Sequence, residues 1–425
     1  MTTGSIIRQR WFAGHGPIVH HEETVARVDA LVAGLIADGR VADEATAYTL
    51  LAAADRLGCV AMNVVAHMTY AKRIDLSGAL LAEEDFKLTP EGHTGGSLNM
   101  VQAFVGYLLA NALTGSTRGW IMGQGHCVAA IEAVNALTGD ISPAQRGRYD
   151  RSEEGLSRLC ADFYSYAINA QGLPAVPLGS HAGPNTAGAV SEGGYLGFAE
   201  LQYIHMPLPG ESLVAFLSDG AFEEQRGPAW APRWWRAQDG GFAVPVMILN
   251  GRRIEQRTQI MQEGGAQWLA EDVRHNSFDP VIVDGRDPSA IAWAILKAED
   301  TLHAFAADPA RRQPAPPPYV IAETEKGFGF PGAGSNAAHN LPLSGNPHTD
   351  AAMRGLFNES AAALFVPPVE LNAALDAFAC HAAQQRPLES ANPMAHRRPA
   401  APKLPEPCWE TPGSERSALT ALDQW

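Results

Sequence analysis

Two polar turns that each follow an apolar run are the part of the sequence best suited to binding a metal ion. The run SLVAFLSDG (212–220) brings Asp219 to its end, and VPVMILN (244–250) ends on Asn250, 31 residues further on. This separation is the length of one strand–helix–strand unit, so both side chains are expected at the same edge of a sheet. A magnesium ion that holds a diphosphate needs hard oxygen ligands, and Asp219, the Asn250 amide and the Arg252 carbonyl can supply them.

A glycine, Gly220, directly follows the candidate carboxylate. Glycine lets the backbone approach a diphosphate closely, and the N–H groups at the start of a following helix would favour the anion. Taken singly, however, S-D-G and L-N-G are more typical of ordinary turns at strand ends. The spacing of the two turns makes a metal–diphosphate site and a pair of unrelated turns about equally good interpretations.

Two histidines lie in glycine-flanked loops beside expected strands and helices. They are His93 in EGHTGGSLN (91–99) and His126 in IMGQGH (121–126). Histidine exchanges protons near neutral pH, so these positions favour a role in proton transfer. Most of the 14 histidines in the chain are expected to be ordinary surface or core residues.

The elements that would position these residues alternate between strands and helices. The sequence predicts a long helix over 44–73, a Gly-rich turn at 91–97, a helix over 98–113, a strand and helix within 119–137, strands at 212–220, 244–250, 280–285 and 316–327, and helices over 221–239 and 288–302. This alternation indicates an α/β fold with a parallel sheet and helices on both faces. In such sheets ligands bind at the carboxyl ends of the strands.

Composition divides the chain into three expected segments. They are an N-terminal arm (1–43), one large α/β domain (44–386), and a Pro-rich linker that leads into the start of a following segment (387–425). The linker is predicted from seven prolines between Pro387 and Pro412.

The bulk properties exclude several classes of function. The formal net charge of −15 gives no general attraction to nucleic acid or to anionic membranes, so neither is an expected partner. Asp55 and Arg56 interrupt the longest apolar run, so no membrane span is predicted, and the start of the chain has no export signal. The five cysteines lie far apart without a C-x-x-C pair, which favours a reducing, cytoplasmic location over a disulfide framework or a zinc site.

The motifs resemble those of phosphoketolases, a family of the thiamine-diphosphate-dependent, transketolase-like superfamily. Six segments match in order between residues 91 and 343: EGHTGGSLN, IMGQGH, SHAGPNTAGAVSEGGYLGF (180–198), LSDG with ILNGRRI, TEKGFGF (324–330) and AHNLPL (338–343). The resemblance extends only over the amino-terminal half of that family. It implies that residues 44–386 form a transketolase-like domain that binds the diphosphate of thiamine diphosphate.

The resemblance also implies a role for each matching residue. The catalytic residues would be His93, His126 and His339, which would line a funnel over the thiazolium ring. The residues that bind thiamine diphosphate would be His181, Gly188, Asp219, Gly220, Asn250, Arg252 and Lys326. Mg²⁺ would be held by Asp219, Asn250 and Arg252, which are the residues that the spacing of the two turns indicates.

Four positions depart from the family pattern. Ser218 stands where a glycine is usual, Arg252 where a tyrosine is usual, Gln124 where a proline is usual and Ser191 where a histidine is usual. These changes affect the expected substrate and acceptor more than the expected cofactor.

The resemblance implies a split enzyme. Phosphoketolases are about twice as long as this chain, and the half without a counterpart here carries the pyrimidine-binding domain, with the glutamate that activates the cofactor. The chain is therefore expected to be inactive alone and to form a heterotetramer with a second polypeptide that supplies this domain. Together they would cleave the C2–C3 bond of a ketose phosphate to give a two-carbon unit. The alternatives are a transketolase-like ketol transfer to another acceptor and a non-catalytic regulatory subunit.

Overall fold

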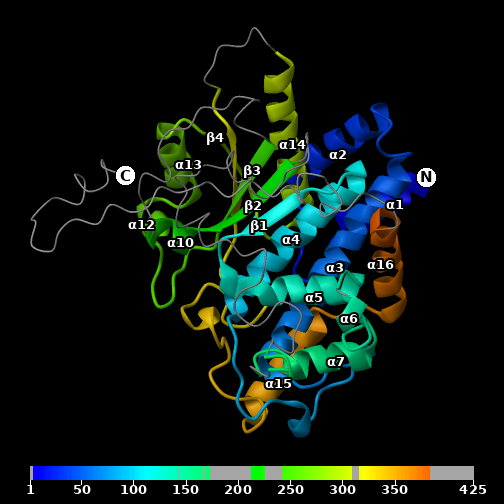
Figure 1. The fold of residues 1–425 in the computed structure, drawn as a ribbon, viewed down its shortest axis with the longest axis vertical. Coiled ribbons are helices and arrows are strands. Elements are labelled where there is room, and N and C mark those ends of the chain that lie inside the picture. Colours follow the sequence, from blue (N-terminus) through cyan, green and yellow to red (C-terminus); the bar gives the residue numbers. More distant parts are fainter. Residues whose placement is uncertain are drawn as a thin grey trace, which may run out of the picture. The chain divides into compact units, whose positions relative to one another are not determined.

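The computed structural model describes residues 3–141, 143–165, 168–172, 212–224, 242–308 and 315–382 (Figure 1). Its strands are β1 (Gly119–Met122), β2 (Ser212–Ser218), β3 (Phe242–Leu249), β4 (Asp279–Asp284) and β5 (Pro318–Glu323). Its α-helices are α1 (Thr3–Phe12), α2 (Glu22–Ala37), α3 (Glu44–Tyr70), α4 (Thr94–Thr114), α5 (Val128–Thr138), α6 (Pro143–Arg146), α7 (Glu153–Asp162), α10 (Asp219–Glu224), α12 (Gln259–Glu263), α13 (Ala266–His275), α14 (Pro288–Ala307), α15 (Ala351–Ala363) and α16 (Pro368–Ala382). Short 3-10 helices are η1 (Glu83–Asp85), η2 (Gly125–Cys127) and η5 (Ala337–His339).

The five strands form one parallel sheet in the order β1-β2-β3-β5-β4. Strands β2 and β3, which both lie inside the sheet, are buried along nearly their whole length, as expected for parallel strands covered on both faces. Ser218, the last residue of β2, pairs with Ile248 near the end of β3. The residues that follow these two strands therefore emerge at the same edge of the sheet, as the spacing of Asp219 and Asn250 predicts.

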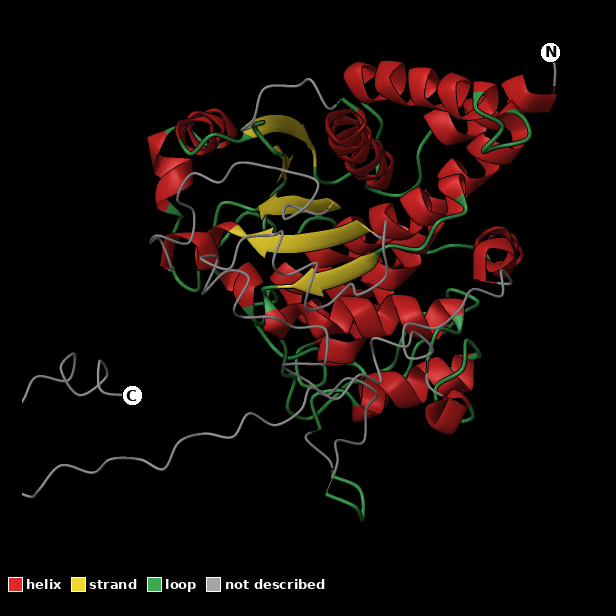
Figure 2. Cartoon of the chain, turned by 45° about the horizontal axis from the view of Figure 1, so that its top comes forward, coloured by secondary structure: helices red, strands yellow, loops and turns green. Residues whose placement is uncertain are grey.

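Helices cover both faces of the sheet, and the strands lie between them in Figure 2. The larger core lies on the face covered by α4 and α14, with α3 and α5 packed behind α4. A smaller core, which includes Leu217, Leu269 and Ile321, lies on the face covered by α10, α12 and α13. The predicted α/β class, with a parallel sheet and helices on both faces, is confirmed.

The long helix predicted over 44–73 is α3, which ends at Tyr70. It begins at Glu44 because the Asp43 side chain accepts a hydrogen bond from the Thr46 N–H and caps the helix. By length and composition α3 is apolar enough to cross a membrane, but 94% of its most apolar window is buried inside the fold. It is therefore the central core helix of this domain.

The Gly-rich turn predicted at 91–97 is wrong, because α4 already begins at Thr94. A Cβ atom at Gly95 would lie 2.2 Å from the Ala338 carbonyl oxygen, and one at Gly96 would lie 2.8 Å from Cys127 Sγ. These glycines allow the first turn of α4 to pack against two neighbouring loops. The strand predicted to residue 220 also ends earlier, at Ser218, because the next residue begins α10.

The described part of the N-terminal segment, residues 3–43, packs against the helices of the domain. Helix α1 contacts α3, and α2 contacts α14. Trp11 is fully buried, and its indole N–H donates to Ser289 Oγ at 3.1 Å. This segment is held by long-range contacts that its own composition does not reveal.

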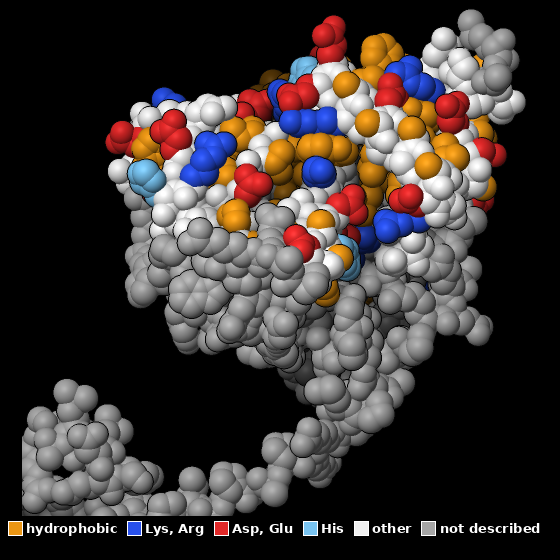
Figure 3. Space-filling model, turned by 90° about the horizontal axis from the view of Figure 1, so that it is seen from above, with side chains coloured by type: hydrophobic (Ala, Val, Ile, Leu, Met, Phe, Trp, Pro, Cys, Tyr) orange, Lys and Arg blue, Asp and Glu red, His pale blue; other side chains and the backbone are white. Residues whose placement is uncertain are grey.

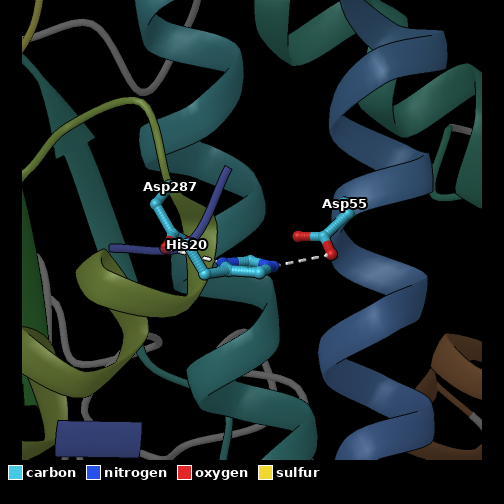
Figure 4. Close-up of side chains that lie close together, drawn as sticks. All are labelled: His20, Asp55 and Asp287. Atoms are coloured by element: carbon cyan, nitrogen blue, oxygen red, sulfur yellow. Dashed lines mark hydrogen bonds and ion pairs between the residues drawn. The ribbon is translucent and has the colours of Figure 1, made fainter. Parts of the chain in front are cut away.

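A buried polar cluster, which we call the His20 anchor (His20, Asp55 and Asp287), ties the same segment to the domain (Figure 4). His20 Nδ1 lies 2.8 Å from Asp287 Oδ2, and His20 Nε2 lies 3.1 Å from Asp55 Oδ2. Burial lowers the pKa of His20, but hydrogen bonds to the two carboxylates outweigh burial and raise it to about 10. The anchor therefore contains an imidazolium between two acidic side chains.

The face shown in Figure 3 carries basic and acidic side chains interspersed among hydrophobic ones. No continuous basic patch is visible among the described residues on this face. The expected Pro-rich linker (387–425) lies outside the described residues.

Candidate functional site

A cavity of about 390 Å³ lies at the carboxyl ends of β1, β2 and β3. Its lining includes His93, Gln124, His126, Ser218, Gly220, Asn250, Arg252, Arg253, Lys326 and His339. Asp219 lies between Ser218 and Gly220 in the sequence, and it is 1% exposed. The structure thus brings together eight of the ten predicted site residues, while the other two, His181 and Gly188, lie outside the described residues.

The two oxygens of the Asp219 carboxylate differ in their surroundings. Oδ2 accepts the Gly251 N–H at 2.7 Å and lies 3.3 Å from the Thr258 hydroxyl. Oδ1 is buried and has no hydrogen-bond partner among the described residues. Burial raises the pKa of Asp219 to about 7. A buried carboxylate oxygen without a partner is costly, so this arrangement suits a ligand that would complete it.

The turn after β3 places two further oxygens beside the carboxylate. The Arg252 N–H donates to Asn250 Oδ1 at 3.1 Å, and Gly251 between them has a φ of 79°. We call Asp219, the Asn250 amide and the Arg252 carbonyl the oxygen cluster. One carboxylate, one amide oxygen and one backbone carbonyl form the hard donor set that Mg²⁺ prefers, so these residues fit the expected ion.

Lys326 lies between the oxygen cluster and the histidines. Its Nζ donates to His339 Nδ1 at 2.7 Å and to the Arg252 and Arg253 carbonyls at 3.4 Å each. The residue is 3% exposed, and burial lowers the pKa of its ammonium group. The predicted lysine therefore contributes a buried cation at the site.

The three predicted catalytic histidines form one group, which we call the histidine cluster (His93, His126 and His339). The ring centroids lie 5.3 Å apart for His93 and His126, and 5.8 Å apart for each pair that includes His339. Burial, the Lys326 ammonium and His93 lower the pKa of His339 to about 4, so its ring is neutral at pH 7. Since its Nδ1 accepts from Lys326, its proton is assigned to Nε2, which can donate to a ligand.

Backbone geometry explains why these histidines converge. His93 is the N-cap residue of α4, His126 lies in η2 after β1, and His339 ends η5. The His93 N–H donates to the Tyr164 hydroxyl at 3.3 Å. Tyr164 has a φ of 59°, an uncommon conformation for a residue other than glycine. No sequence motif marked Tyr164, because its position depends on this long-range contact.

Two of the residues that depart from the family pattern, Ser218 and Gln124, line the cavity. Ser218 Oγ accepts the Ala221 N–H at 3.4 Å and so helps to start α10 where a glycine is usual. Gln124 is buried in the cavity wall, and its Oε1 has no hydrogen-bond partner among the described residues. Ser191 lies outside the described residues.

The His20 anchor also contains three groups close enough to bind a metal ion, with ligand atoms within 4.8 Å of one another. The imidazole ring, however, lies between the two carboxylates and faces one with each nitrogen (Figure 4). A metal ion would have to replace one of these hydrogen bonds. The anchor is therefore better explained as an ion triad that holds the fold together.

Comparison with known proteins identifies the family. The family described as the XFP N-terminal domain, which is the N-terminal domain of phosphoketolase, matches residues 46–359. A probable phosphoketolase of Rhodopseudomonas palustris (strain BisB5) is 29% identical over 249 residues, which cover 53% of this chain and 30% of that protein. A probable phosphoketolase of Schizosaccharomyces pombe is 26% identical over 305 residues, which cover 67% of this chain and 35% of that protein. The chain thus matches about a third of the length of these relatives.

The solved structures that match this chain include two transketolases. The transketolase from Leishmania mexicana has a TM-score of 0.40 at 15% identity, with 79% of this chain and 47% of that chain covered. The transketolase from Campylobacter jejuni has a TM-score of 0.37 at 15% identity, with 77% and 48% covered. The assignment rests on the family match over 46–359: the chain belongs to the phosphoketolase family and carries its N-terminal domain.

Proposed function

We propose that this chain is the diphosphate-binding half of a split, thiamine-diphosphate-dependent enzyme that cleaves a ketose phosphate between C2 and C3. Phosphoketolases are a family of thiamine-diphosphate- and magnesium-dependent lyases. The observation that carries the proposal is the oxygen cluster at the sheet edge, beside the histidine cluster. The unpartnered Asp219 Oδ1 is the atom in this cluster that most clearly requires a ligand.

In this proposal the oxygen cluster holds Mg²⁺, and the ion in turn holds the diphosphate. Asp219 supplies one carboxylate oxygen, Asn250 its amide oxygen and Arg252 its backbone carbonyl. Gly220 lines the cavity without a side chain, which leaves space for the diphosphate beside α10. The chemistry that bound thiamine diphosphate supplies is attack on a carbonyl and storage of the electron pair released by C–C cleavage.

The histidine cluster would bind and orient the sugar. His339, neutral and with its proton on Nε2, can donate a hydrogen bond to a carbonyl or hydroxyl oxygen of the donor. His93 and His126 lie on the same cavity wall and can move a proton to or from a donor hydroxyl. Lys326 would keep His339 in the required tautomer and supply positive charge for an anionic group.

The proposal includes a second polypeptide. The matched segments cover only 30% and 35% of two phosphoketolase relatives, which supports the proposal that the pyrimidine-binding domain is supplied separately. We propose that a partner chain supplies it in a heterotetramer and that this chain alone is inactive. The family resemblance places the activating glutamate in the half that has no counterpart here.

The experiment is native mass spectrometry of this chain, co-expressed with the product of the neighbouring gene, in the presence of thiamine diphosphate and Mg²⁺. A heteromer that carries the cofactor, and loses it in Asp219→Ala, is the expected result. Incubation of that heteromer with ketose phosphates and inorganic phosphate then identifies the acceptor. Acetyl phosphate supports the phosphoketolase reaction, whereas a new sugar supports ketol transfer. A heteromer that never holds cofactor would contradict the catalytic proposal and favour a regulatory subunit.

A further inference from the structure

We infer that Thr258 is a positioning residue for the metal ion: its hydroxyl orients the Asp219 carboxylate so that Oδ1 is the oxygen presented to the ion. This inference rests on the proposed function, because it assigns the residue that prepares the same site. Thr258 lies outside every motif that marked the site in the sequence and is fully buried.

The direction of the Thr258 hydrogen bonds follows from the groups around its hydroxyl. Thr258 is the N-cap of α12, and its Oγ1 lies 3.4 Å from the Met261 N–H, which can only donate. The oxygen of the hydroxyl is therefore the acceptor there, and its proton is available to Asp219 Oδ2 at 3.3 Å. Both distances are long for such bonds, and ligand binding is expected to shorten them.

The Gly251 N–H is the second donor to Oδ2, at 2.7 Å. Two donors that converge on one oxygen fix the rotation of the carboxylate about its last bond. Oδ1, without a partner among the described residues, is then turned to the remaining side. With the Gly251 donor alone, the plane of the carboxylate would be held at one point and could rotate away from the ion.

The loop over 250–258, which ends at Thr258, also carries Asn250 and Arg252. Contacts of Thr258 therefore help to position all three proposed oxygen ligands. The Thr258 N–H donates to the Gly251 carbonyl at 3.1 Å, and the Arg253 N–H donates to the Gln256 carbonyl at 2.9 Å. Arg252 and Arg257 form an antiparallel bridge across the loop. The loop over 250–258 is thus closed on itself, and Thr258 fastens its far end to Asp219.

Glu223 holds the start of α12 from the other side. Its Oε1 accepts the Ile260 N–H at 2.6 Å, and its Oε2 lies 3.7 Å from Arg253 Nε. Because Glu223 and Asp219 both belong to α10, this helix contacts the loop at two points. The cap residue Thr258 is therefore held within reach of the carboxylate even without an ion.

The test compares Mn²⁺ binding, in the presence of thiamine diphosphate, to the proposed heteromer made with the full-length wild-type chain, with Thr258→Val or with Thr258→Ser. Valine keeps the shape and removes the hydroxyl, whereas serine keeps the hydroxyl. Bound Mn²⁺ is measured by electron paramagnetic resonance, and folding by thermal unfolding of each metal-free variant. Ser152→Ala is the matched control, because Ser152 caps α7 through the Gly155 N–H at 3.0 Å, away from the oxygen cluster.

We expect Thr258→Val to weaken Mn²⁺ binding about 10- to 100-fold, which is typical when a partner of a metal ligand is lost. Thr258→Ser should restore binding to about the wild-type value, and Ser152→Ala should lower the unfolding temperature without weakening binding. Wild-type binding that Thr258→Val leaves unchanged overturns the role of Thr258 alone. Absence of Mn²⁺ binding by the wild-type heteromer overturns the proposed function and this role together. Weak binding by both the valine and the serine variants would also contradict the role of the hydroxyl.

Discussion

The His20 anchor and the oxygen cluster are both buried and polar, but they differ in how their charge is balanced. In the His20 anchor, both nitrogens of the imidazolium face carboxylates, and Asp287 also accepts the Ser289 N–H. One acceptor of the anchor, Asp55 Oδ1, has no partner among the described residues. The anchor thus carries its own cation, which is what a cluster that holds a fold together requires.

The oxygen cluster lacks such an internal counter-charge. Lys326, which is not a member of the cluster, lowers the pKa of Asp219 and donates to the Arg252 carbonyl, but it donates to neither oxygen of the Asp219 carboxylate. Burial therefore dominates and raises the pKa of Asp219 to about 7. A buried acid that is paired inside its own cluster therefore indicates a structural role, whereas one that faces further oxygens and a cavity indicates a binding site for a cation.

The largest expected effect is on the oxygen cluster. Asp219→Asn keeps the shape of the side chain and removes its charge, so Mg²⁺-dependent binding of thiamine diphosphate should fall more than about 100-fold, beyond the loss typical of an indirect partner. The fold should remain, because no internal ion pair is broken. Isothermal titration with Mg²⁺ and thiamine diphosphate, with circular dichroism as the folding control, measures both. Unchanged affinity for thiamine diphosphate in the presence of Mg²⁺ would show that the oxygen cluster is not the metal site.

The His20 anchor should respond in the opposite way. His20→Gln leaves two buried carboxylates without their cation, so the free energy of unfolding should fall by about 3–5 kcal/mol. Urea denaturation measures the change. Molecules of this variant that remain folded should bind Mg²⁺ and thiamine diphosphate like the wild type. A loss of metal affinity at unchanged stability would instead indicate that the anchor is a ligand site.

A variant of His339 separates the residues that bind the cofactor from those that act on the substrate. His339→Asn removes the Nε2–H donor, so turnover by the assembled enzyme should fall about 100-fold, as is typical for loss of a group that transfers or holds a proton. Affinity for thiamine diphosphate should change little, because His339 is not in the oxygen cluster. A large loss of cofactor affinity with unchanged turnover would contradict this role.

The smallest effect is the pH dependence of stability. The pKa of His20 in the folded protein, about 10, exceeds the ordinary histidine value of 6.5, so its stabilising effect is complete below about pH 6.5 and is lost as the pH rises through 10. Burial raises the pKa of Asp55 from 3.8 to about 6, so ionisation of this carboxyl destabilises the fold as the pH rises from about 4 to 6 and adds no further change above that range. Thermal unfolding should show that the wild type loses stability between pH 7 and 10.

The matched variant for this titration is His20→Gln, which has no group at position 20 that titrates. Its stability should lack the part of the decline between pH 7 and 10 that His20 causes in the wild type. Parallel curves for the two proteins would show that another group is responsible.

The features that the sequence predicted correctly are those that depend on local patterns. Strands β2 and β3 are apolar runs because both faces are covered, and one strand–helix–strand spacing brings Asp219 and Asn250 to one edge. The resemblance to phosphoketolases added His339 and Lys326, which the structure places in hydrogen-bond contact. Their proximity depends on a loop whose course no local pattern defines.

The features that the sequence did not predict depend on contacts between distant residues. The sequence did not predict that α4 begins at Thr94. The glycine at position 95 is required by close packing against the Ala338 carbonyl, which is more than 240 residues away in the sequence. The packing of α1 depends on the bond between Trp11 and Ser289. Thr258 has no motif of its own, since its importance comes from the proximity of Asp219.

In the proposed enzyme, Asp219, Asn250 and Arg252 together hold the metal ion of a bound diphosphate. The most direct measurement is anomalous X-ray diffraction from crystals grown with Mn²⁺ and thiamine diphosphate. We predict one Mn²⁺ peak about 2.0–2.3 Å from Asp219 Oδ1, the Asn250 amide oxygen and the Arg252 carbonyl oxygen, which is the distance range of such ligands. A cofactor-bound structure whose ion lies elsewhere, or lacks Asp219 Oδ1 as a ligand, would contradict the account.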